Sequence, residues 1–419
     1  MSKVITDRKL VEELLTRGVE KIYPSYENLE KKLLSGERIR LYCGYDPTSS
    51  SLHIGNAISI NKLAQFQALG HEVIFLVGDF TGLIGDPTDK KAVRKKLTRE
   101  EVLTNALNYK DQASAYLKFT GDNPAKILYN SEWNDKLTFR DLIELSSNFT
   151  VQQMIQRDMF QERLKDEKPI YLHEFLYPLT QAYDSVAMDV DLEIGGNDQM
   201  FNMMCGRDLL RVLKNKEKSV LTMKLLADES GKKMGKTEGN VVSLNETAND
   251  MYGKVMSWPD GILVSAFELC TNVPLDELKK IEKELKSAKA NPRDFKMKLA
   301  YEITKINRGQ EAADKAQENF VSTIQKKEVP EEIEAYPATK KQNSLVDLLV
   351  ETKLAKSKTE ARQKIEEGAI RIRLEKSGQE PAAEMTVVKD VKKEINFDGE
   401  IDAAVIQKGK FTFIRVMPF

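Results

Sequence analysis

The chain has 419 residues, of which 41% are hydrophobic and 31% are charged, and this length favours two or three domains with a sizeable core. Its 64 lysines and arginines nearly balance its 65 aspartates and glutamates, so a nucleic-acid partner, if there is one, must be met by local basic patches. No run of about 18 apolar residues occurs and the N-terminus is charged and helix-like, which disfavours a membrane span or a signal peptide and favours a soluble, cytoplasmic protein.

The first half of the chain alternates strand-like and helix-like patterns. Residues 38–46 (RIRLYCGYD) read as a strand, residues 53–70 (HIGNAISINKLAQFQALG) as a helix closed by a glycine, and residues 72–80 (EVIFLVGDF) as the next strand. Further strand-like runs occupy 125–130 and 188–196, and 99–119 shows a helical pattern. Strand, helix and strand in this order form a βαβ unit. We therefore predict an α/β fold with a doubly wound, Rossmann-like parallel sheet.

The composition changes after this α/β region. Residues 247–325 read mostly as helices, which predicts a helical domain. Residues 326–341 (KKEVPEEIEAYPATKK) are charged, contain two prolines and lack periodicity, which predicts a linker. A last small module covers 342–419. The predicted boundaries are thus 1–246, 247–325, 326–341 and 342–419.

The cysteines and histidines limit the kinds of site that the chain can hold. Cys43, Cys205 and Cys270 are scattered and odd in number, which argues against a disulfide framework and fits a reducing compartment. The chain has 3 histidines, and no cysteine pair has the spacing of a metal site. We therefore expect no protein-bound metal.

Two segments carry a pattern that favours phosphate binding. His53 stands between a strand and a helix, where backbone N–H groups and the helix dipole attract anions. Residues 230–240 (SGKKMGKTEGN) combine glycines, lysines and a threonine, which can bring ammonium groups onto a polyphosphate. Taken alone, His53 could be a helix cap or a packed surface residue, and the second segment could be a solvated basic loop. Together they favour a nucleotide site.

These two segments carry a family resemblance. HIGN (53–56) and KMGKT (233–237) resemble the HIGH and KMSKS signatures of class I aminoacyl-tRNA synthetases. Five motifs, at 42–56, 78–94, 175–184, 192–199 and 232–237, stand in the order seen in bacterial tyrosyl-tRNA synthetases, and the match spans about 35–260. The chain departs from the signatures at Asn56, Gly235 and Thr237. Thr237 keeps a hydroxyl, whereas an Asn at position 56 can donate to an oxygen but cannot titrate.

The resemblance implies a two-step reaction. Tyrosine and ATP form tyrosyl-adenylate and pyrophosphate, and the tyrosyl group is then transferred to the terminal ribose of tRNA-Tyr. Because the substrate carboxylate is the nucleophile, catalysis comes from positioning and from stabilising charge. Mg²⁺ is expected as the counter-ion of ATP, held by phosphates and water. The residues that the resemblance places on the phosphate chain are Thr48, His53, Lys90, Arg94, Lys233, Lys236 and Thr237.

The resemblance also assigns an amino-acid pocket. Selecting tyrosine over phenylalanine needs buried polar groups that pair with the phenol. The tyrosyl-tRNA synthetases are themselves the standard example of this rule. Tyr42 and Asp184 take that role, and the further tyrosine contacts are Thr81, Asp86, Tyr177 and Gln181. Without the resemblance, the spacing of Tyr177, Gln181 and Asp184 describes an ordinary polar helix face. The ATP contacts are Cys43, Gly55, Asn56, Gly196, Asp198 and Gln199. Glu193 stands where many relatives carry Gln, and its role is left open.

The resemblance extends to two partner surfaces. Residues 131–164 resemble the dimer-forming insertion of the family, which we place at about 131–170, although their apolar residues could equally be ordinary core. These apolar residues are Leu142, Ile143, Leu145, Val151, Met154, Ile155 and Met159. Residues 348–372 resemble a small α+β RNA-binding fold, although such a charge run can also be a solvated face. The proposed phosphate contacts there are Lys353, Lys356, Lys358, Arg362, Arg371 and Arg373.

Three functions are therefore compared. The first is a tyrosyl-tRNA synthetase that acts as a homodimer on L-tyrosine, ATP and tRNA-Tyr. The second is the tryptophanyl relative, against which Tyr42, Asp184 and the GGNDQ segment (195–199) speak. The third is a catalytically silent RNA-binding paralogue, against which the intact His53 and Lys233 argue.

Overall fold

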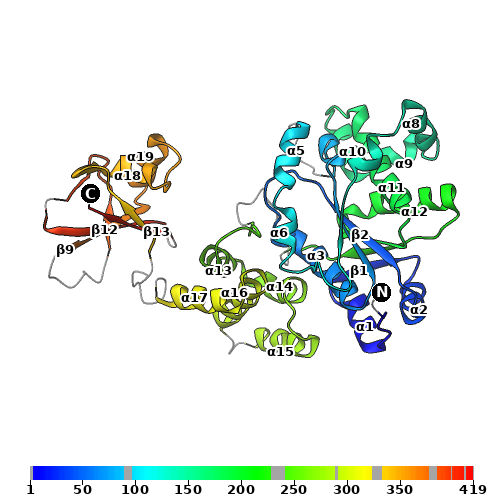
Figure 1. Ribbon diagram of the computed structural model, residues 1–419, viewed down its shortest axis with the longest axis horizontal. Helices are drawn as coiled ribbons and strands as arrows, with labels where there is room; N and C mark the ends of the chain where they lie inside the picture. Colours follow the sequence, from blue (N-terminus) through cyan, green and yellow to red (C-terminus); the bar gives the residue numbers. More distant parts are fainter. Residues whose placement is uncertain are drawn as a thin grey trace. The chain divides into compact units, whose positions relative to one another are not determined.

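Figure 1 shows the chain as a computed structural model, which describes residues 3–88, 97–227, 241–287, 291–322, 333–376, 385–397, 399–409 and 412–418. The chain divides into two compact units. The first consists of Met1–Glu246 and Ser257–Arg308, and the second consists of Thr247–Met256 and Gly309–Phe419. Among the described residues, no helix is both long enough and apolar enough to cross a membrane.

The first unit is built on a six-stranded sheet with the order β1-β6-β5-β2-β3-β4. Its strands are β1 (Val19–Tyr23), β2 (Arg40–Tyr45), β3 (Glu72–Val77), β4 (Lys126–Tyr129), β5 (Leu192–Gly196) and β6 (Ser219–Met223). Strands β6, β5, β2, β3 and β4 run parallel, whereas the edge strand β1 pairs antiparallel with β6. The predicted parallel sheet is therefore confirmed, and the antiparallel edge strand is an addition that the sequence pattern did not indicate.

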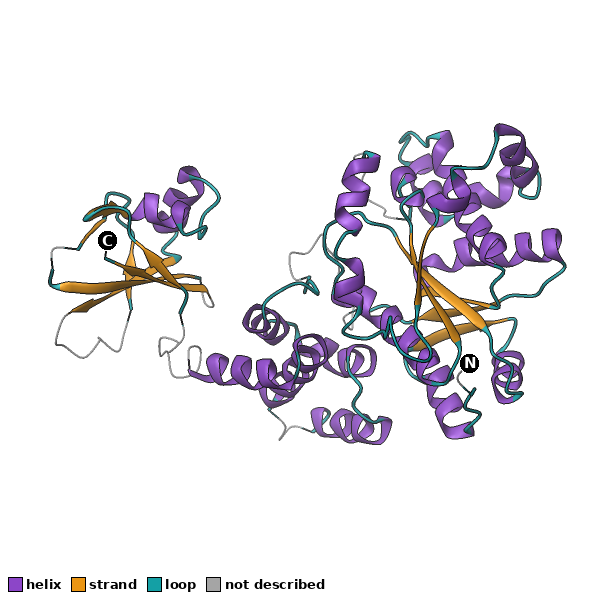
Figure 2. Ribbon diagram, in the orientation of Figure 1, coloured by secondary structure: helices purple, strands orange, loops and turns teal. Residues whose placement is uncertain are grey.

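Helices cover both faces of this sheet, as Figure 2 shows. The hydroxyl of Tyr45 lies 3.0 Å from that of Ser59 on α3 (Ile54–Ala68), whereas the hydroxyl of Tyr42 lies 2.9 Å from that of Ser185 on α11 (Leu176–Met188). Because successive side chains of a strand point to opposite faces, α3 and α11 lie on opposite sides of β2. This is the doubly wound arrangement predicted from the sequence.

The remaining helices of the first unit range from 4 to 17 residues in length. They are α1 (Arg8–Thr16), α2 (Tyr26–Leu34), α4 (Thr81–Ile84), α5 (Arg99–Ala106), α6 (Tyr109–Ala113), α7 (Ser131–Asn134), α8 (Phe139–Ser146), α9 (Val151–Ile155), α10 (Asp158–Lys165), α12 (Met200–Lys214), α14 (Leu263–Cys270), α15 (Leu275–Leu285) and α16 (Pro292–Arg308), with the 3-10 turns η1 (Leu172–Phe175), η2 (Asn197–Gln199) and η4 (Asp260–Ile262).

Two predicted elements differ in extent from the observed ones. The helical pattern over 99–119 forms the two helices α5 and α6. The strand predicted over 188–196 is shorter, because α11 continues to Met188 and Asp189 then adopts the left-handed conformation (φ 50°, ψ 56°) that ends the helix. The strand proper is Leu192–Gly196. By contrast, α3 is followed by Gly70 with φ 92°, the terminating glycine that the sequence predicted.

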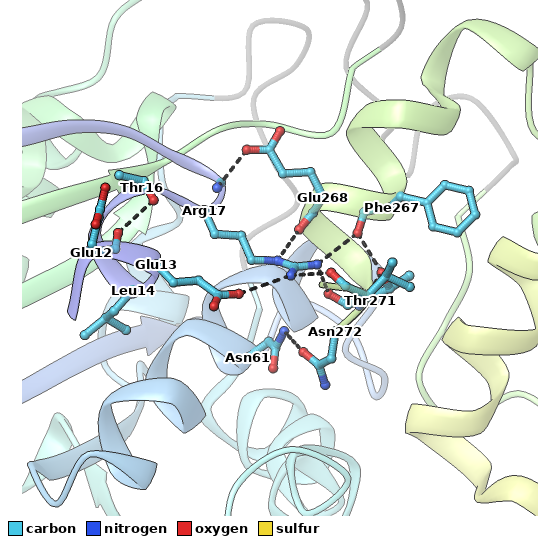
Figure 3. Close-up of polar contacts among 12 residues, drawn as sticks. Glu12, Glu13, Leu14, Thr16, Arg17, Asn61, Phe267, Glu268, Thr271 and Asn272 are labelled. Atoms are coloured by element: carbon cyan, nitrogen blue, oxygen red, sulfur yellow. Dashed lines mark hydrogen bonds and ion pairs between the residues drawn. The ribbon is translucent and has the colours of Figure 1, made fainter. Parts of the chain in front are cut away.

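Helices α14 to α16 belong to the same unit as the sheet. Figure 3 shows how Arg17, which follows α1 directly, reaches the end of α14. Its buried guanidinium donates to four carbonyl oxygens, at distances between 2.6 and 3.3 Å, and these belong to Phe267, Glu268, Thr271 and Val273. The carbonyl groups at the end of a helix need such donors, and Arg17 supplies them from a distant part of the chain.

The predicted helical domain over 247–325 therefore differs from the observed division. Residues 257–308 join the sheet unit, whereas α13 (Ala248–Met256) and α17 (Gln310–Phe320) belong to the second unit. The physical reason is visible at Arg17, whose hydrogen bonds attach α14 to the N-terminal helix. The predicted boundaries of functional domains remain a proposal.

The second unit contains a small α+β module with its own core. A five-stranded sheet has the order β10-β9-β12-β13-β7, and β11 and β8 form a separate pair. The elements are β7 (Ala335–Pro337), β8 (Gln342–Ser344), α18 (Leu345–Glu351), α19 (Lys358–Glu366), β9 (Ile370–Lys376), β10 (Thr386–Val388), β11 (Glu394–Asn396), β12 (Ile401–Lys408) and β13 (Thr412–Met417). The buried core of this module runs from Ala338 to Val416.

The predicted linker over 326–341 is wrong in its second part. Residues Ala335–Pro337 form the strand β7, which pairs in parallel with β13 at the edge of the sheet. Three residues are too few to show a periodicity of two, and a proline is compatible with an edge strand, so the pattern did not reveal it. Residues 326–332 of this prediction lie outside the described residues.

Candidate active site

The described site residues gather where the parallel strands end. In an open α/β sheet the ligand crevice lies beyond the carboxyl ends of the strands, at the point where the strand order reverses. Here β3 and β4 lie on one side of β2, and β5 and β6 lie on the other. Asp46 follows β2, Asn130 follows β4, and Gly196 ends β5. The sequence motifs thus converge on one edge of the sheet.

Asp46 connects the first group of polar side chains. Its Oδ1 accepts a hydrogen bond from the hydroxyl of Thr81 at 2.6 Å, and its Oδ2 accepts one from the hydroxyl of Tyr177 at 2.8 Å. Gly78 makes room for this carboxylate, because a Cβ at position 78 would lie 2.0 Å from Asp46 Oδ1. Burial, followed by the charges of Asp46 and Asp86, raises the pKa of Tyr177 well above its usual value. Tyr177 is therefore a neutral hydrogen-bond donor.

Asp184 lies at the centre of a buried group of donors. Trp133 Nε1 at 2.7 Å and Asn134 Nδ2 at 3.1 Å donate to its Oδ1, and Asn130 Nδ2 at 3.2 Å donates to its Oδ2. Burial raises the pKa of Asp184 to about 8, whereas these three N–H groups oppose the effect and favour the ionised form. Sequence reasoning missed these three residues. The available signal was the position of Asn130 at the end of the strand predicted over 125–130.

Tyr42 is fully buried between α11 and the neighbouring strand β5. Its hydroxyl lies 2.9 Å from the hydroxyl of Ser185, which is the residue after Asp184. Burial, followed by the charges of Glu193 and Asp184, raises the pKa of Tyr42 well above its usual value. One turn earlier in α11, Gln181 Nε2 donates to Glu193 Oε1 at 3.1 Å. The buried Oε1 of Gln181 has no hydrogen-bond partner among the described residues.

Asp86 contacts one residue of its own motif and one of the motif at 192–199. Its Oδ1 accepts from the hydroxyl of Thr88, and its Oδ2 accepts from Gln199 Nε2, both at 2.6 Å. The buried guanidinium of Arg157 donates to Thr88 Oγ1 at 2.9 Å and lies 3.9 Å from Asp86 Oδ1. Arg157 comes from the segment predicted as a dimer-forming insertion, and its polar helical surroundings gave no sequence signal for a place in the site.

His53 is the N-cap of α3, as its position after a strand suggested. Its Nδ1 accepts from the backbone N–H of Asn56 at 3.3 Å, and Asn56 Oδ1 accepts from the backbone N–H of His53 at 3.0 Å. This reciprocal pair is a capping box, so Asn56 stabilises the helix start. Gly55 allows the imidazole to lie over this turn, because a Cβ there would lie 3.0 Å from the ring.

The segment that follows the second signature lies beside His53. Ile54 N donates to Val242 O at 2.9 Å, Leu244 N donates to Leu52 O at 2.8 Å, and His53 pairs with Ser243. Residues 242–244, which come after the KMGKT segment in the sequence, therefore lie directly next to HIGN. The signature residues Lys233, Lys236 and Thr237, together with Lys90 and Arg94, lie outside the described residues.

The other predicted nucleotide contacts occupy the same edge. Thr48 N donates to the carbonyl of Asp46 at 2.8 Å. Cys43 is buried within β2, and burial raises the pKa of its thiol to about 11, so it is a neutral thiol. Gly196 is required at the end of β5, because a Cβ there would lie 2.5 Å from Asp198 Oδ1. Among the described residues, no group of three or more His, Cys, Asp and Glu side chains could hold a metal ion.

The predicted basic face lies on α19, on β9 and on the turn before α19. Five of its six members are exposed, namely Lys353, Lys356, Lys358, Arg362 and Arg371. Lys358 forms an ion pair with Asp347 at 2.8 Å. Arg373 has a side chain that is only 11% exposed and pairs with Glu375, which makes it the least accessible of the six.

Comparison with known proteins places this geometry in a family. Residues 34–325 match the family model described as tRNA synthetases class I (W and Y), and residues 325–416 match the model of the tyrosine–tRNA ligase SYY-like C-terminal domain. The tyrosine–tRNA ligase of Thermotoga maritima is 40% identical over 404 residues, which cover 96% of each chain. That of Haemophilus ducreyi is 40% identical over 403 residues, again covering 96% of each chain.

Solved structures show the same fold at lower identity. A C-terminally truncated mitochondrial tyrosyl-tRNA synthetase of Aspergillus nidulans is 20% identical with a TM-score of 0.63, covering 75% of this chain and 94% of that one. The tyrosyl-tRNA synthetase of Archaeoglobus fulgidus, solved with L-tyrosine, is 22% identical with a TM-score of 0.58, covering 74% of this chain and all of that one. The chain therefore belongs to the class I aminoacyl-tRNA synthetases, in the family of the bacterial tyrosine–tRNA ligases.

Proposed function

We propose that the crevice at the carboxyl ends of β2 to β5 is where this tyrosine–tRNA ligase activates L-tyrosine. A carboxylate oxygen of tyrosine attacks the α-phosphorus of ATP, the bond to the β-phosphate breaks, and pyrophosphate leaves. A hydroxyl of the terminal adenosine of tRNA-Tyr then attacks the carbonyl carbon, and AMP leaves. The observation that carries the site assignment is the pair of buried polar groups, Tyr42 and Asp184, on β2 and the adjacent α11.

Tyrosine binding is assigned to residues on β2, α4 and α11. The hydroxyl of Tyr42 and the carboxylate of Asp184 face the substrate phenol, and both groups are buried. A phenylalanine ring has no hydroxyl to pair with them, so it is rejected. Gln181 contributes to the cradle of the substrate ammonium, since its buried Oε1 is an acceptor with no partner among the described residues. Thr81, Asp86 and Tyr177 complete this cradle.

ATP binding is assigned to the two signatures and to the end of β5. The start of α3 at His53, with Thr48, Gly55 and Asn56, receives the phosphates, because N–H groups at a helix N-terminus favour anions. Cys43, Gly196, Asp198 and Gln199 contact the nucleoside. The cations Lys90, Arg94, Lys233 and Lys236, with the hydroxyl of Thr237, stabilise the leaving pyrophosphate. Mg²⁺ is bound by the ATP phosphates and water, because a carboxylate cage is not part of the described site.

Two partner surfaces complete the proposal. The exposed side chains of Lys353, Lys356, Lys358, Arg362 and Arg371, with Arg373 beside them, bind tRNA phosphates. A homodimer forms through the insertion at about 131–170, where the apolar side chains of Phe139, Ile143 and Val151 are 78%, 54% and 70% exposed. In the same insertion, Leu145, Met154 and Met159 are buried and belong to the core. The expected compartment is the cytoplasm.

The phenol assignment is tested by removing a single hydroxyl. In Tyr42→Phe, the preference for tyrosine over phenylalanine in ATP–pyrophosphate exchange should fall by about 5–10-fold, because one neutral hydrogen bond contributes roughly 1 kcal/mol. The ratio of the two kcat/KM values, each measured in the wild-type chain and in the variant, reads this directly.

Tyr45→Phe is the matched control. Tyr45 lies on the same strand, is equally buried and also pairs with a serine hydroxyl, but on the opposite face of the sheet. Its removal should leave the preference for tyrosine unchanged. An equal effect of both variants would show that Tyr42 acts through stability and does not contact the substrate.

A further inference from the structure

A buried ion pair is connected to Tyr42 through Ser185, and neither of its residues has been assigned a function so far. Lys218, directly before β6, donates from its Nζ to Glu193 Oε2 on β5, and the two side chains are 0% and 3% exposed. The same ammonium donates to the hydroxyl of Ser185 at 2.8 Å. Ser185 in turn is the hydrogen-bond partner of Tyr42. A continuous chain of hydrogen bonds therefore joins a buried cation to the tyrosine pocket.

The direction of these hydrogen bonds follows from the chemistry of the groups. A lysine ammonium has donors and no acceptor, so Ser185 Oγ must accept from Lys218. Ser185 then has its own proton to donate, either to Tyr42 Oη at 2.9 Å or to Glu193 Oε2 at 3.4 Å. Only the first distance is typical of an O–H···O hydrogen bond. Ser185 therefore donates to Tyr42, and the proton of the Tyr42 hydroxyl is available for the pocket.

We propose that Lys218 is a positioning residue for substrate specificity, which acts through Ser185 to make Tyr42 a donor towards the para substituent of the amino acid. This inference rests on the proposed tyrosine pocket. The three N–H groups that donate to Asp184 favour its ionised form, in which it supplies the matching acceptor, because Asn130 occupies only one of the lone pairs of Oδ2. The pocket thus presents one donor and one acceptor, which is what a phenol hydroxyl requires.

Helix α12 packs directly against this chain of hydrogen bonds, which we call the relay. A Cβ at Gly206 of α12 would lie 2.7 Å from Lys218 Nζ, 2.8 Å from Ser185 Oγ and 3.4 Å from Glu193 Oε2. Gly206 is itself buried, so the glycine lets α12 close directly over all three groups. The ammonium is therefore held in one place, and its direction of donation is fixed by packing as well as by charge.

The probe is 4-amino-L-phenylalanine, whose para amine donates hydrogen bonds well and accepts poorly. The wild-type pocket should disfavour it, because the amine faces the donor of Tyr42. In the double variant Glu193→Gln/Lys218→Met, which leaves no unpaired buried charge, Tyr42 can donate to Ser185 and accept from the amine instead. The ratio of kcat/KM for tyrosine over the probe in pyrophosphate exchange should fall roughly tenfold, about the effect of one neutral hydrogen bond.

Two further variants complete the set. Ser185→Ala interrupts the chain of hydrogen bonds and leaves both members of the ion pair in place, so it should reproduce the fall and gives a second route if the double variant does not fold. Tyr45→Phe removes an equally buried hydroxyl on the opposite face of β2 and leaves the chain of hydrogen bonds intact, so it should keep the wild-type ratio. Thermal unfolding of each variant accompanies the kinetics.

Each outcome decides one of two questions. A fall in the ratio that is confined to the double variant and Ser185→Ala supports the proposed role of Lys218. Unchanged ratios in those two variants, or an equal fall in Tyr45→Phe, would overturn it. Absence of tyrosine-dependent exchange in the wild-type chain would instead refute the proposed function, and this inference with it.

Discussion

Several residues of the site act by holding another side chain in place. Asn130, Trp133 and Asn134 donate to Asp184, and Ser185 contacts Tyr42. A buried carboxylate is costly unless such donors satisfy it. In the proposed pocket, specificity would therefore depend also on residues that lie outside the signatures and need not touch the substrate.

A buried histidine outside the site gives a prediction for acid stability. His71 is 1% exposed, and neither ring nitrogen has a hydrogen-bond partner among the described residues. Burial, with a smaller effect of the nearby Arg38, lowers the pKa of His71 to about 4 from an ordinary value of about 6.5. Between these values the unfolded state binds more protons, so His71 costs stability as the pH falls from about 6.5 towards 4.

The variant His71→Leu should lose this dependence. Relative to the variant, the free energy of unfolding of the wild-type chain should fall by roughly 3 kcal/mol between pH 7 and pH 4. Urea unfolding at a series of pH values measures the difference, and the same replacement at the exposed His173 is the control. Wild-type and His71→Leu curves that stay parallel would contradict the assignment.

At the scale of elements, the proposed functional residues lie at the start of a helix or on one exposed face of a helix and a strand. The capping box of His53 and Asn56 explains how an Asn fits a position that the family signature fills with His, because its side chain closes the first turn of α3. In the C-terminal module, α19 and β9 present the basic face. In the first example the polar side chains lie at a helix N-terminus, and in the second they lie on the exposed face of a helix and a strand.

The basic face should govern the salt dependence of tRNA binding. Replacing Lys353, Lys356, Arg362 and Arg371 by Ala together should weaken binding of tRNA-Tyr and reduce the slope of log affinity against log salt by roughly 3, because each lost phosphate contact contributes about 0.7–0.9. Filter binding at several salt concentrations measures the slope. Tyrosine-dependent pyrophosphate exchange should be unchanged, because the module has a core of its own.

Single replacements on the same module provide the comparison. Arg371→Ala should lower the slope by about 0.7–0.9, the contribution of one phosphate contact. Lys364→Ala should not, because the Lys364 ammonium is already paired with Glu367 at 2.8 Å. Equal slopes in the wild-type chain and the fourfold variant would mean that this face is solvated surface and that the tRNA is held elsewhere.

At the scale of the whole molecule, the sequence indicated most of the fold and only part of the site. The parallel sheet, α3 and its closing glycine were predicted because apolar periodicity and glycine positions are local signals. The attachment of α14 through Arg17 and the pairing of β7 with β13 were missed, because they depend on contacts between distant segments. Lys218 was missed for the same reason, since its role depends on three different elements.

The two units also divide the reaction. The residues assigned to tyrosine, and the described residues assigned to ATP, belong to the unit of the six-stranded sheet, whereas the basic face belongs to the second unit. We therefore expect activation of the amino acid and binding of tRNA phosphates to be separable in this chain.

The most direct test of the central claim is ATP–pyrophosphate exchange measured with each of the twenty amino acids in turn. The geometry of Tyr42 and Asp184 predicts that L-tyrosine supports rapid exchange and that tryptophan supports none. Phenylalanine should support very little, because it leaves the hydroxyl proton of Tyr42 and the remaining acceptor position of Asp184 without a partner. Exchange supported better by phenylalanine or tryptophan than by tyrosine, or no exchange with any amino acid, would contradict the account.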